Sequence, residues 1–216
     1  MKNKVKTLDE AINMIHDGQT MLISGFTFAG TPEKLIDGLV KRGIKDLNLI
    51  TNDTGTAEFG IGKLIVNKCA KTLTTSHIGL NRETGRQMTA GEIDVTLVPQ
   101  GTLAEKIRAG GAGLGGILTP TGVGTVVEEG KQKINVGGRD YLLEEPIRAE
   151  VALIKAWKAD TYGNLTYRRA ARNFNPIMAT AADLVIVEAE EIVEVGELDP
   201  EIVFTPGIMI DVVVQG

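Results

Sequence analysis

The stretch from Asp17 to Pro32 constrains the fold more than any other part of the chain. Its apolar run, Met21 to Ile23, is typical of a short strand buried on both faces. The loop Ser24–Gly30 follows and has glycines near both ends. Thr31 then predicts a helix N-cap, with Pro32 in the first helical turn. A strand, a glycine-flanked loop and a helix N-terminus together predict a site for an anion such as phosphate, pyrophosphate or carboxylate.

Strand and helix alternate through the first half of the chain. We expect strands at 21–23, 47–51, 72–76 and 93–98, and helices near 8–15, 35–40, 61–67 and 103–109. The polar segment before the last of these strands predicts no element. This alternation predicts an α/β fold, with a mostly parallel sheet flanked by helices. Because ligands bind beyond the carboxyl ends of strands in such sheets, three loops should converge on one site: Ser24–Gly30, Asn52–Gly55 and Pro99–Gly101.

The pattern changes after Gly110. Residues 110–124 contain seven glycines, which predicts irregular structure. Gly137-Gly138 predicts a hairpin turn between strands at 133–136 and 139–143. Further strands are expected at 151–157, 164–167, 183–189 and 208–214, and a helix from 175 to about 182. We therefore expect one domain, residues 1–216, with a small antiparallel insertion.

Charge and composition exclude several functional classes. A net charge of −5 argues against a general nucleic-acid binder, because binding to phosphate backbones needs clustered Lys and Arg. No apolar run approaches the ~20 residues of a membrane helix, and the first residues do not resemble a secretory signal. A single cysteine, Cys69, excludes an internal disulfide and suits the cytoplasm. No spacing of His, Cys and acidic residues indicates a metal site.

Two groups of charged residues have no assigned role. Arg168, Arg169 and Arg172 form a compact basic group that fits a solvated surface, a contact with a partner subunit or an anchor for a distal phosphate. The glutamates between 188 and 197 alternate with apolar residues, which is typical of a strand with one face in water.

Gln100 is a candidate for binding a substrate oxygen. The tripeptide Pro99-Gln100-Gly101 ends a strand and begins a helix, so the amide is expected to face the ligand cleft. An amide stabilises a carboxylate or thioester oxygen without adding charge, as an oxyanion-hole donor does. A simple helix-capping turn is an equally good interpretation.

Several separated motifs, in order, resemble one known family. Asp17-Gly18, Met21-Leu22-Ile23, Ser24-Gly25-Phe26, Gly30 and Pro32 match its signature, with Ser24 in place of the first glycine of a Gly-Gly-Phe motif. Further matches are Pro99-Gln100-Gly101-Thr102, Arg108-Ala109-Gly110-Gly111, the segment Thr119 to Thr125, Ala152 to Ala156, Arg172-Asn173-Phe174-Asn175-Pro176 and Thr205-Pro206-Gly207. The chain thus resembles, over essentially its whole length, the A (alpha) subunit of the class I 3-oxoacid CoA-transferases, of the acetate/butyrate–acetoacetate type.

The resemblance implies a ping-pong transfer of coenzyme A (CoA) between a short-chain acyl-CoA and a free carboxylic acid. The nucleophile is then a glutamate of a B subunit, so no catalytic residue is expected on this chain. CoA is implied as a substrate, with no permanently bound cofactor, and an α2β2 assembly is expected.

The resemblance also implies which residues form the site. The expected contacts with CoA are Ser24, Gly25, Phe26, Thr27, Phe28, Ala29 and Gly30. Asn52 and Gln100 are expected to face the carboxylate or thioester, and the segment Gly110–Gly124 to lie at the subunit boundary or over the site.

Two other functions stay open. A self-sufficient sugar-phosphate isomerase or thioester hydrolase would need a base within the chain, for which Glu58 is the best candidate. A non-catalytic module would bind CoA or a phosphorylated metabolite without turnover.

Overall fold

The computed structural model describes residues 3–216, and a mostly parallel sheet runs through its centre. Seven parallel strands lie in the order β11-β10-β8-β1-β2-β3-β4, and β9 pairs antiparallel with β8. The bounds are β1 Thr20–Ile23, β2 Leu47–Asp53, β3 Ala70–His77, β4 Asp94–Leu97, β8 Ala149–Asp160, β9 Leu165–Thr166, β10 Ala182–Val193 and β11 Val212–Gln215. The predicted α/β class is confirmed.

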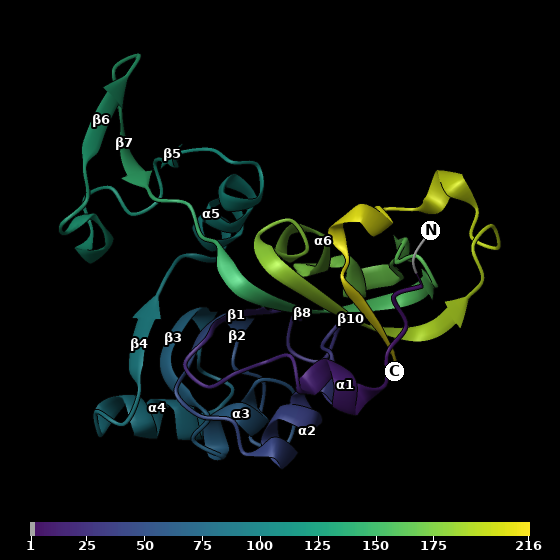
Figure 1. Ribbon diagram of the computed structural model, residues 1–216. Coiled ribbons are helices and arrows are strands. Elements are labelled where there is room, and N and C mark those ends of the chain that lie inside the picture. Colours follow the sequence, from purple (N-terminus) through teal and green to yellow (C-terminus); the bar gives the residue numbers. More distant parts are fainter. Residues whose placement is uncertain (1–2) are drawn as a thin grey trace.

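Helices cover both faces of this sheet (Figure 1). One face carries α1 Leu8–Ile12, α2 Glu33–Arg42, α3 Gly62–Val66 and α4 Arg82–Thr89; the other carries α5 Gln100–Gly111 and α6 Asn175–Met178. Met21 and Ile23 pack into the core of the first face and Leu22 into that of the second, all fully buried. This two-sided burial explains the unbroken apolar run of β1. Among the described residues, none of the helices has both the length and the apolar character needed to span a bilayer.

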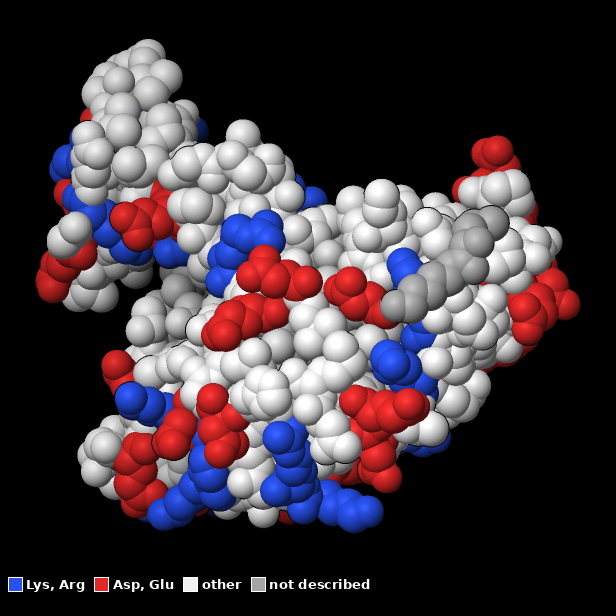
Figure 2. All heavy atoms as spheres, viewed as in Figure 1, with Lys and Arg blue, Asp and Glu red and all other residues white. Residues whose placement is uncertain are grey.

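A small antiparallel sheet projects from the body (Figures 1 and 2). It contains β5 Ile117–Thr119, β6 Lys133–Val136 and β7 Arg139–Glu144, in the order β5-β7-β6. Gly137 and Gly138 form the predicted hairpin turn, with φ values of 60° and 84°. Figure 2 also shows that charges of both signs are interspersed on the face in view.

A buried carboxylate fastens this sheet to α5. Glu144, which is 1% exposed, accepts hydrogen bonds from Lys106 Nζ at 3.0 Å and Lys131 Nζ at 2.5 Å. Burial raises the pKa of Glu144, but the two ammonium groups outweigh it and hold that pKa below its ordinary value. The ionised carboxylate therefore joins the small sheet to the main domain.

The expectation that residues 110–124 are irregular throughout is wrong. Helix α5 continues through Gly110 and Gly111, and β5 forms within the segment. A Cβ atom at Gly110 would lie 1.9 Å from the carbonyl oxygen of Ile147, and one at Gly111 would lie 1.9 Å from Thr180 Oγ1. These two glycines thus permit close packing of α5 against its neighbours.

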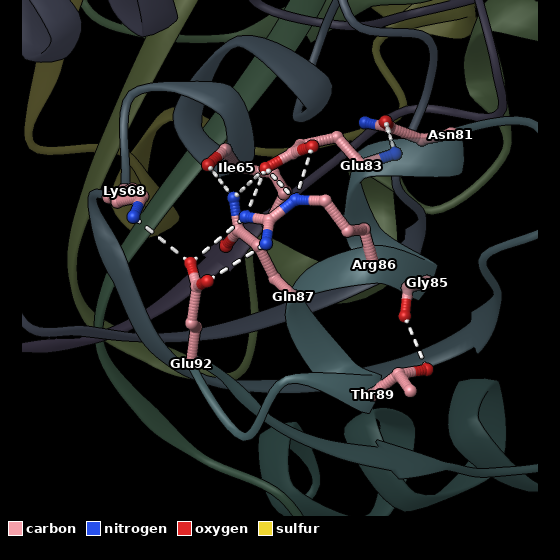
Figure 3. Close-up of polar contacts among 9 residues, drawn as sticks. All are labelled: Ile65, Lys68, Asn81, Glu83, Gly85, Arg86, Gln87, Thr89 and Glu92. Atoms are coloured by element: carbon pink, nitrogen blue, oxygen red, sulfur yellow. Dashed lines mark hydrogen bonds and ion pairs between the residues drawn. The ribbon is translucent and has the colours of Figure 1, made fainter.

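Helix α4 was not predicted, because polar residues hold it in place (Figure 3). Asn81 caps it by accepting a hydrogen bond from the Glu83 N–H at 3.1 Å. Gln87 is buried and donates to the Ile65 carbonyl at 2.9 Å. Arg86 lies between Glu83 and Glu92 at 2.8 Å from each, and its hydrogen bonds lower the pKa of both carboxyl groups to about 2.

Several element ends differ from the sequence prediction, including those of β8 and β10, which extend beyond the expected 151–157 and 183–189. The capping box of Thr7 and Glu10 forms as expected, but α1 ends at Ile12 rather than near Ile15. Helix α6 ends at Met178, and β11 begins at Val212 after a short 3₁₀ turn. The 3₁₀ turns are η1 Val126–Glu128, η2 Arg169–Arg172, η3 Pro200–Ile202 and η4 Gly207–Met209.

Candidate functional site

Two turns of the same shape lie at the carboxyl ends of β1 and β2. We name Gly25–Gly30 the β1 turn and Gly55–Gly60 the β2 turn. The second and fifth residues of each turn form an antiparallel bridge: Phe26 with Ala29, and Thr56 with Phe59. All four flanking glycines have positive φ, between 53° and 129°. Sequence reasoning missed this repetition, although both segments begin and end on glycine at the same spacing.

The two turns contact each other and expose aromatic rings. Phe28 and Phe59 meet edge to face, with ring centroids 5.0 Å apart. Phe26 and Phe28 are 48% and 59% exposed. Two exposed phenyl rings on one turn offer an apolar surface that a ligand or partner can cover.

The prediction that Thr31 caps the following helix is wrong. Helix α2 begins at Glu33, Pro32 occupies the cap position, and the side chain of Thr31 does not cap the helix. The Thr31 hydroxyl instead donates to the Thr27 carbonyl at 3.4 Å, within the site loop. Proline has a fixed φ and lacks an N–H, so it fits at the start of a helix.

The positive end of α2 is neutralised from within the protein. The N–H of Leu35 donates to Glu188 Oε2 at 3.1 Å, and Glu188 Oε1 lies 2.7 Å from Lys155 Nζ. Glu188 is 1% exposed, so the prediction that it lies on a solvent-exposed face of a strand is also wrong. Since this carboxylate takes the role of an anion at the helix dipole, a ligand at the β1 turn must be held by other groups.

Asp53 joins the β1 turn to the β2 turn. This carboxylate is 6% exposed and accepts three N–H hydrogen bonds. The donors are the backbone of Thr27 at 2.8 Å, the backbone of Gly55 at 2.8 Å and the side chain of Asn52 at 2.7 Å. Sequence reasoning did not single out Asp53, because its partner Thr27 lies on a different loop.

Asn52 continues this network to α5. Its side-chain oxygen accepts from Gln100 Nε2 at 2.8 Å and from Ser76 Oγ at 3.2 Å. The expected convergence of the loops after β1, β2 and β4 is therefore confirmed. Asn52 is 2% exposed, so it lies behind Gln100 and orients it instead of facing a ligand itself.

Gln100 is the exposed end of the network. It is the first residue of α5, and its amide bonds to Asn52 and not to the helix backbone, so the helix-capping interpretation is not supported. One hydrogen of its amide nitrogen is donated to Asn52, and the second is available to an oxygen atom of a ligand. A fixed amide beside a helix N-terminus can stabilise negative charge on that oxygen.

Ser24 anchors the β1 turn on its buried side. It is 1% exposed, and its hydroxyl donates to Asn175 Oδ1 at 2.5 Å. Asn175 is fully buried and donates in turn to the Gly30 carbonyl at 3.0 Å. The serine that departs from the family signature thus fills space beneath the turn, and the surface of the turn is formed by the residues after it.

Glu58, the candidate base for a self-sufficient enzyme, is exposed at the tip of the β2 turn. Between residues 3 and 216, no hydrogen bond or ion pair orients its carboxylate. This position does not support a general base activated by burial or by a neighbouring charge.

Residues 5–216 match the family model described as coenzyme A transferase. The chain belongs to this family. It is 56% identical over 211 residues to the acetate CoA-transferase subunit alpha of Escherichia coli strain K12, covering 98% of this chain and 96% of that one. It is 49% identical over 215 residues to the acetoacetyl-CoA:acetate/butyrate CoA transferase alpha subunit of Clostridium acetobutylicum, covering 100% and 99%. The chain is thus a CoA-transferase subunit of the A (alpha) type, as the sequence motifs predicted.

Solved structures show the same fold. Glutaconate coenzyme A-transferase from Acidaminococcus fermentans superposes with a TM-score of 0.89 at 21% identity, covering 99% of this chain and 75% of that one. The acyl-CoA transferase apoenzyme from Escherichia coli O157:H7 superposes with a TM-score of 0.88 at 22% identity. This chain, covered completely, spans 48% of that longer chain.

Proposed function

We propose that this A subunit, together with a B subunit, transfers CoA between a short-chain acyl-CoA and a free carboxylic acid. Acetyl-, butyryl- and acetoacetyl-CoA are the proposed donors. The observation that carries the proposal is similarity along nearly the full chain to alpha subunits named for acetate and for acetoacetyl-CoA:acetate/butyrate transfer. We also propose a cytoplasmic α2β2 assembly; the names of relatives as A or alpha subunits support the presence of a second type of subunit.

In the proposed reaction, a glutamate of the B subunit attacks the thioester carbonyl and expels the CoA thiolate. The resulting acyl–glutamyl anhydride is attacked by that thiolate at the glutamyl carbonyl, which releases the carboxylic acid and leaves a glutamyl-CoA thioester. A second acid reverses these steps. A carboxylate is a weak nucleophile, so binding energy from the rest of CoA has to lower the barrier.

This chain contributes binding and charge stabilisation. The β1 turn is proposed to contact CoA through Phe26 to Gly30, while Ser24 and Gly25 shape the turn. Gln100 is proposed to donate its second amide hydrogen to the carbonyl oxygen that becomes negative when the thioester is attacked. The hydrogen bond that Gln100 donates to Asn52 supports this role, because it fixes the amide before substrate binds.

Trapping the covalent intermediate tests the proposal. The chain is co-expressed with a CoA-transferase B subunit and the complex is incubated with acyl-CoA and treated with hydroxylamine. The labelled peptide is then identified by mass spectrometry. We expect turnover only with both subunits and a hydroxamate on a glutamate of the B subunit.

Three results would contradict the proposal. An adduct on any side chain of this chain would place the nucleophile here. Turnover by this chain alone would favour a self-sufficient hydrolase or isomerase. CoA binding without turnover after reconstitution would favour a binding module.

A further inference from the structure

A pocket of about 350 Å³ lies beside the β1 turn, on the side of β8. Its walls are Phe28–Gly30 of the turn, Lys155–Trp157 of β8 and Arg168–Ala171 at η2, and Glu190 of β10 completes it. Strands β8 and β2 flank β1 on opposite sides. The pocket and the network that holds Gln100 therefore lie on opposite sides of the β1 turn.

Cations outnumber anions in the pocket wall. Lys155 is paired with the buried Glu188, and Arg168 lies 3.3 Å from Glu190 and stacks over the Trp157 ring. Arg169 differs from both, because no hydrogen bond or ion pair joins its side chain to another residue in the described part of the chain. Its exposed guanidinium leaves the pocket with uncompensated positive charge.

The backbone around Arg169 is held in an uncommon conformation. Arg169 has a φ of 54°, in the left-handed region, which costs a non-glycine residue about 1 kcal/mol. Asn175 donates to the Ala171 carbonyl at 2.7 Å as well as to Gly30, and Asn173 donates to the Ala29 carbonyl at 2.9 Å. These hydrogen bonds join the segment Arg168–Ala171 to the β1 turn, so the pocket is formed before any ligand binds.

This charge and position fit one end of the proposed substrate. CoA carries its thiol at one end and a pyrophosphate and a 3′-phosphate at the other, and a guanidinium binds phosphate oxygens in pairs. We propose that this pocket binds the phosphate end of CoA, with Arg169 as a direct ligand. The thioester end then crosses the β1 turn to Gln100. This inference rests on the proposed function.

Substrates with and without the phosphates test the proposal. In the enzyme reconstituted with its B subunit, Arg169→Ala is expected to raise the KM for acyl-CoA about 10-fold or more, because a charge-assisted contact is lost. Kinetics with the matching acyl-pantetheine should not change, and Arg169→Lys should recover part of the effect. Arg139→Ala is the matched control, since Arg139 is an exposed arginine stacked on Tyr141 in the small sheet.

The outcomes separate this inference from the proposed function. Unchanged acyl-CoA kinetics in Arg169→Ala, or equal losses with acyl-CoA and acyl-pantetheine, would overturn the phosphate site. Weaker association with the B subunit in light scattering, with normal KM values, would overturn it and assign the pocket to an acidic segment of the partner. If the wild-type complex shows no turnover, the proposed function fails. In that case, calorimetric titration of the complex with CoA and with pantetheine tests the phosphate site. A lower affinity of Arg169→Ala for CoA, with an unchanged affinity for pantetheine, supports the site, and any other result overturns it.

Discussion

Replacement of Asp53 by asparagine tests whether the two turns and Gln100 act as one unit. The carboxylate accepts three short hydrogen bonds at a 6% exposed position. Asparagine keeps one oxygen and presents an NH₂ group where the other stood. At least one N–H of Thr27, Gly55 or Asn52 then faces a donor and loses its partner.

The magnitude follows from the number and type of bonds. A hydrogen bond to a charged group contributes about 1.5–3 kcal/mol. Loss of one such bond should lower the free energy of unfolding by about 2 kcal/mol, which for a chain of this size lowers Tm by about 4–8 °C. A neutral amide oxygen is also a weaker acceptor for Asn52 than the carboxylate, so Gln100 is held less firmly and we expect kcat to fall about 10-fold.

Asp160→Asn is the matched control for this assay. Asp160 is also buried, at 2% exposed, and accepts three N–H bonds from Tyr162 and Asn164 in the turn after β8. Both variants should lose similar stability in thermal unfolding. Only Asp53→Asn should lose kcat in the reconstituted enzyme, measured at a temperature where both are folded. If both variants retain wild-type kcat, Asp53 is a structural residue and the coupling to Gln100 is refuted.

Three further changes test other parts of the structure. Gly25→Ala places a Cβ atom 2.2 Å from Thr31 Oγ1 at a φ of 129°, so it should cost about 1–3 kcal/mol and raise the KM for acyl-CoA; normal kinetics would exclude the β1 turn from the site. Gln100→Ala should lower kcat about 100-fold with little change in Tm, and unchanged turnover would show that Gln100 does not bind the oxyanion. In the folded protein Glu83 and Glu92 have pKa values of about 2, below the ordinary 4.5, so their stabilising effect is present above pH 4.5 and is lost as pH falls toward 2. The Tm difference between wild type and Arg86→Ala should therefore be largest near about pH 6 and shrink in acid; a difference independent of pH would contradict the assigned charges.

Local patterns were sufficient to predict the sheet and the convergence of three loops at one edge of it. The run Met21 to Ile23 indicates a strand buried on both faces, and Gly137-Gly138 indicates a hairpin, because each depends only on neighbouring residues. The convergence of three loops followed from one topological rule for parallel strands. The family motifs then indicated which loops matter.

Interactions between distant segments were not predictable from such patterns. In the sequence, Glu188 is one of several glutamates that alternate with apolar residues. Only the folded structure shows that its carboxylate pairs with Lys155 and accepts a hydrogen bond at the N-terminus of α2. Asp53 gains its role from Thr27, which is on another loop. Helix α4 lacks an apolar period because its buried positions are Thr84 and Gln87. The repeated glycine spacing of the two turns was available in the sequence and was overlooked.

The contact between the two turns limits how this site can diversify. A Cβ atom at Gly60 would already lie 3.3 Å from the Thr31 side chain, and Phe28 rests against Phe59. An inserted or deleted residue in either turn would displace the other and, through Asp53, shift the amide of Gln100. New acyl preferences should therefore arise by exchange of side chains at the tips of the turns, while the lengths of both turns stay fixed.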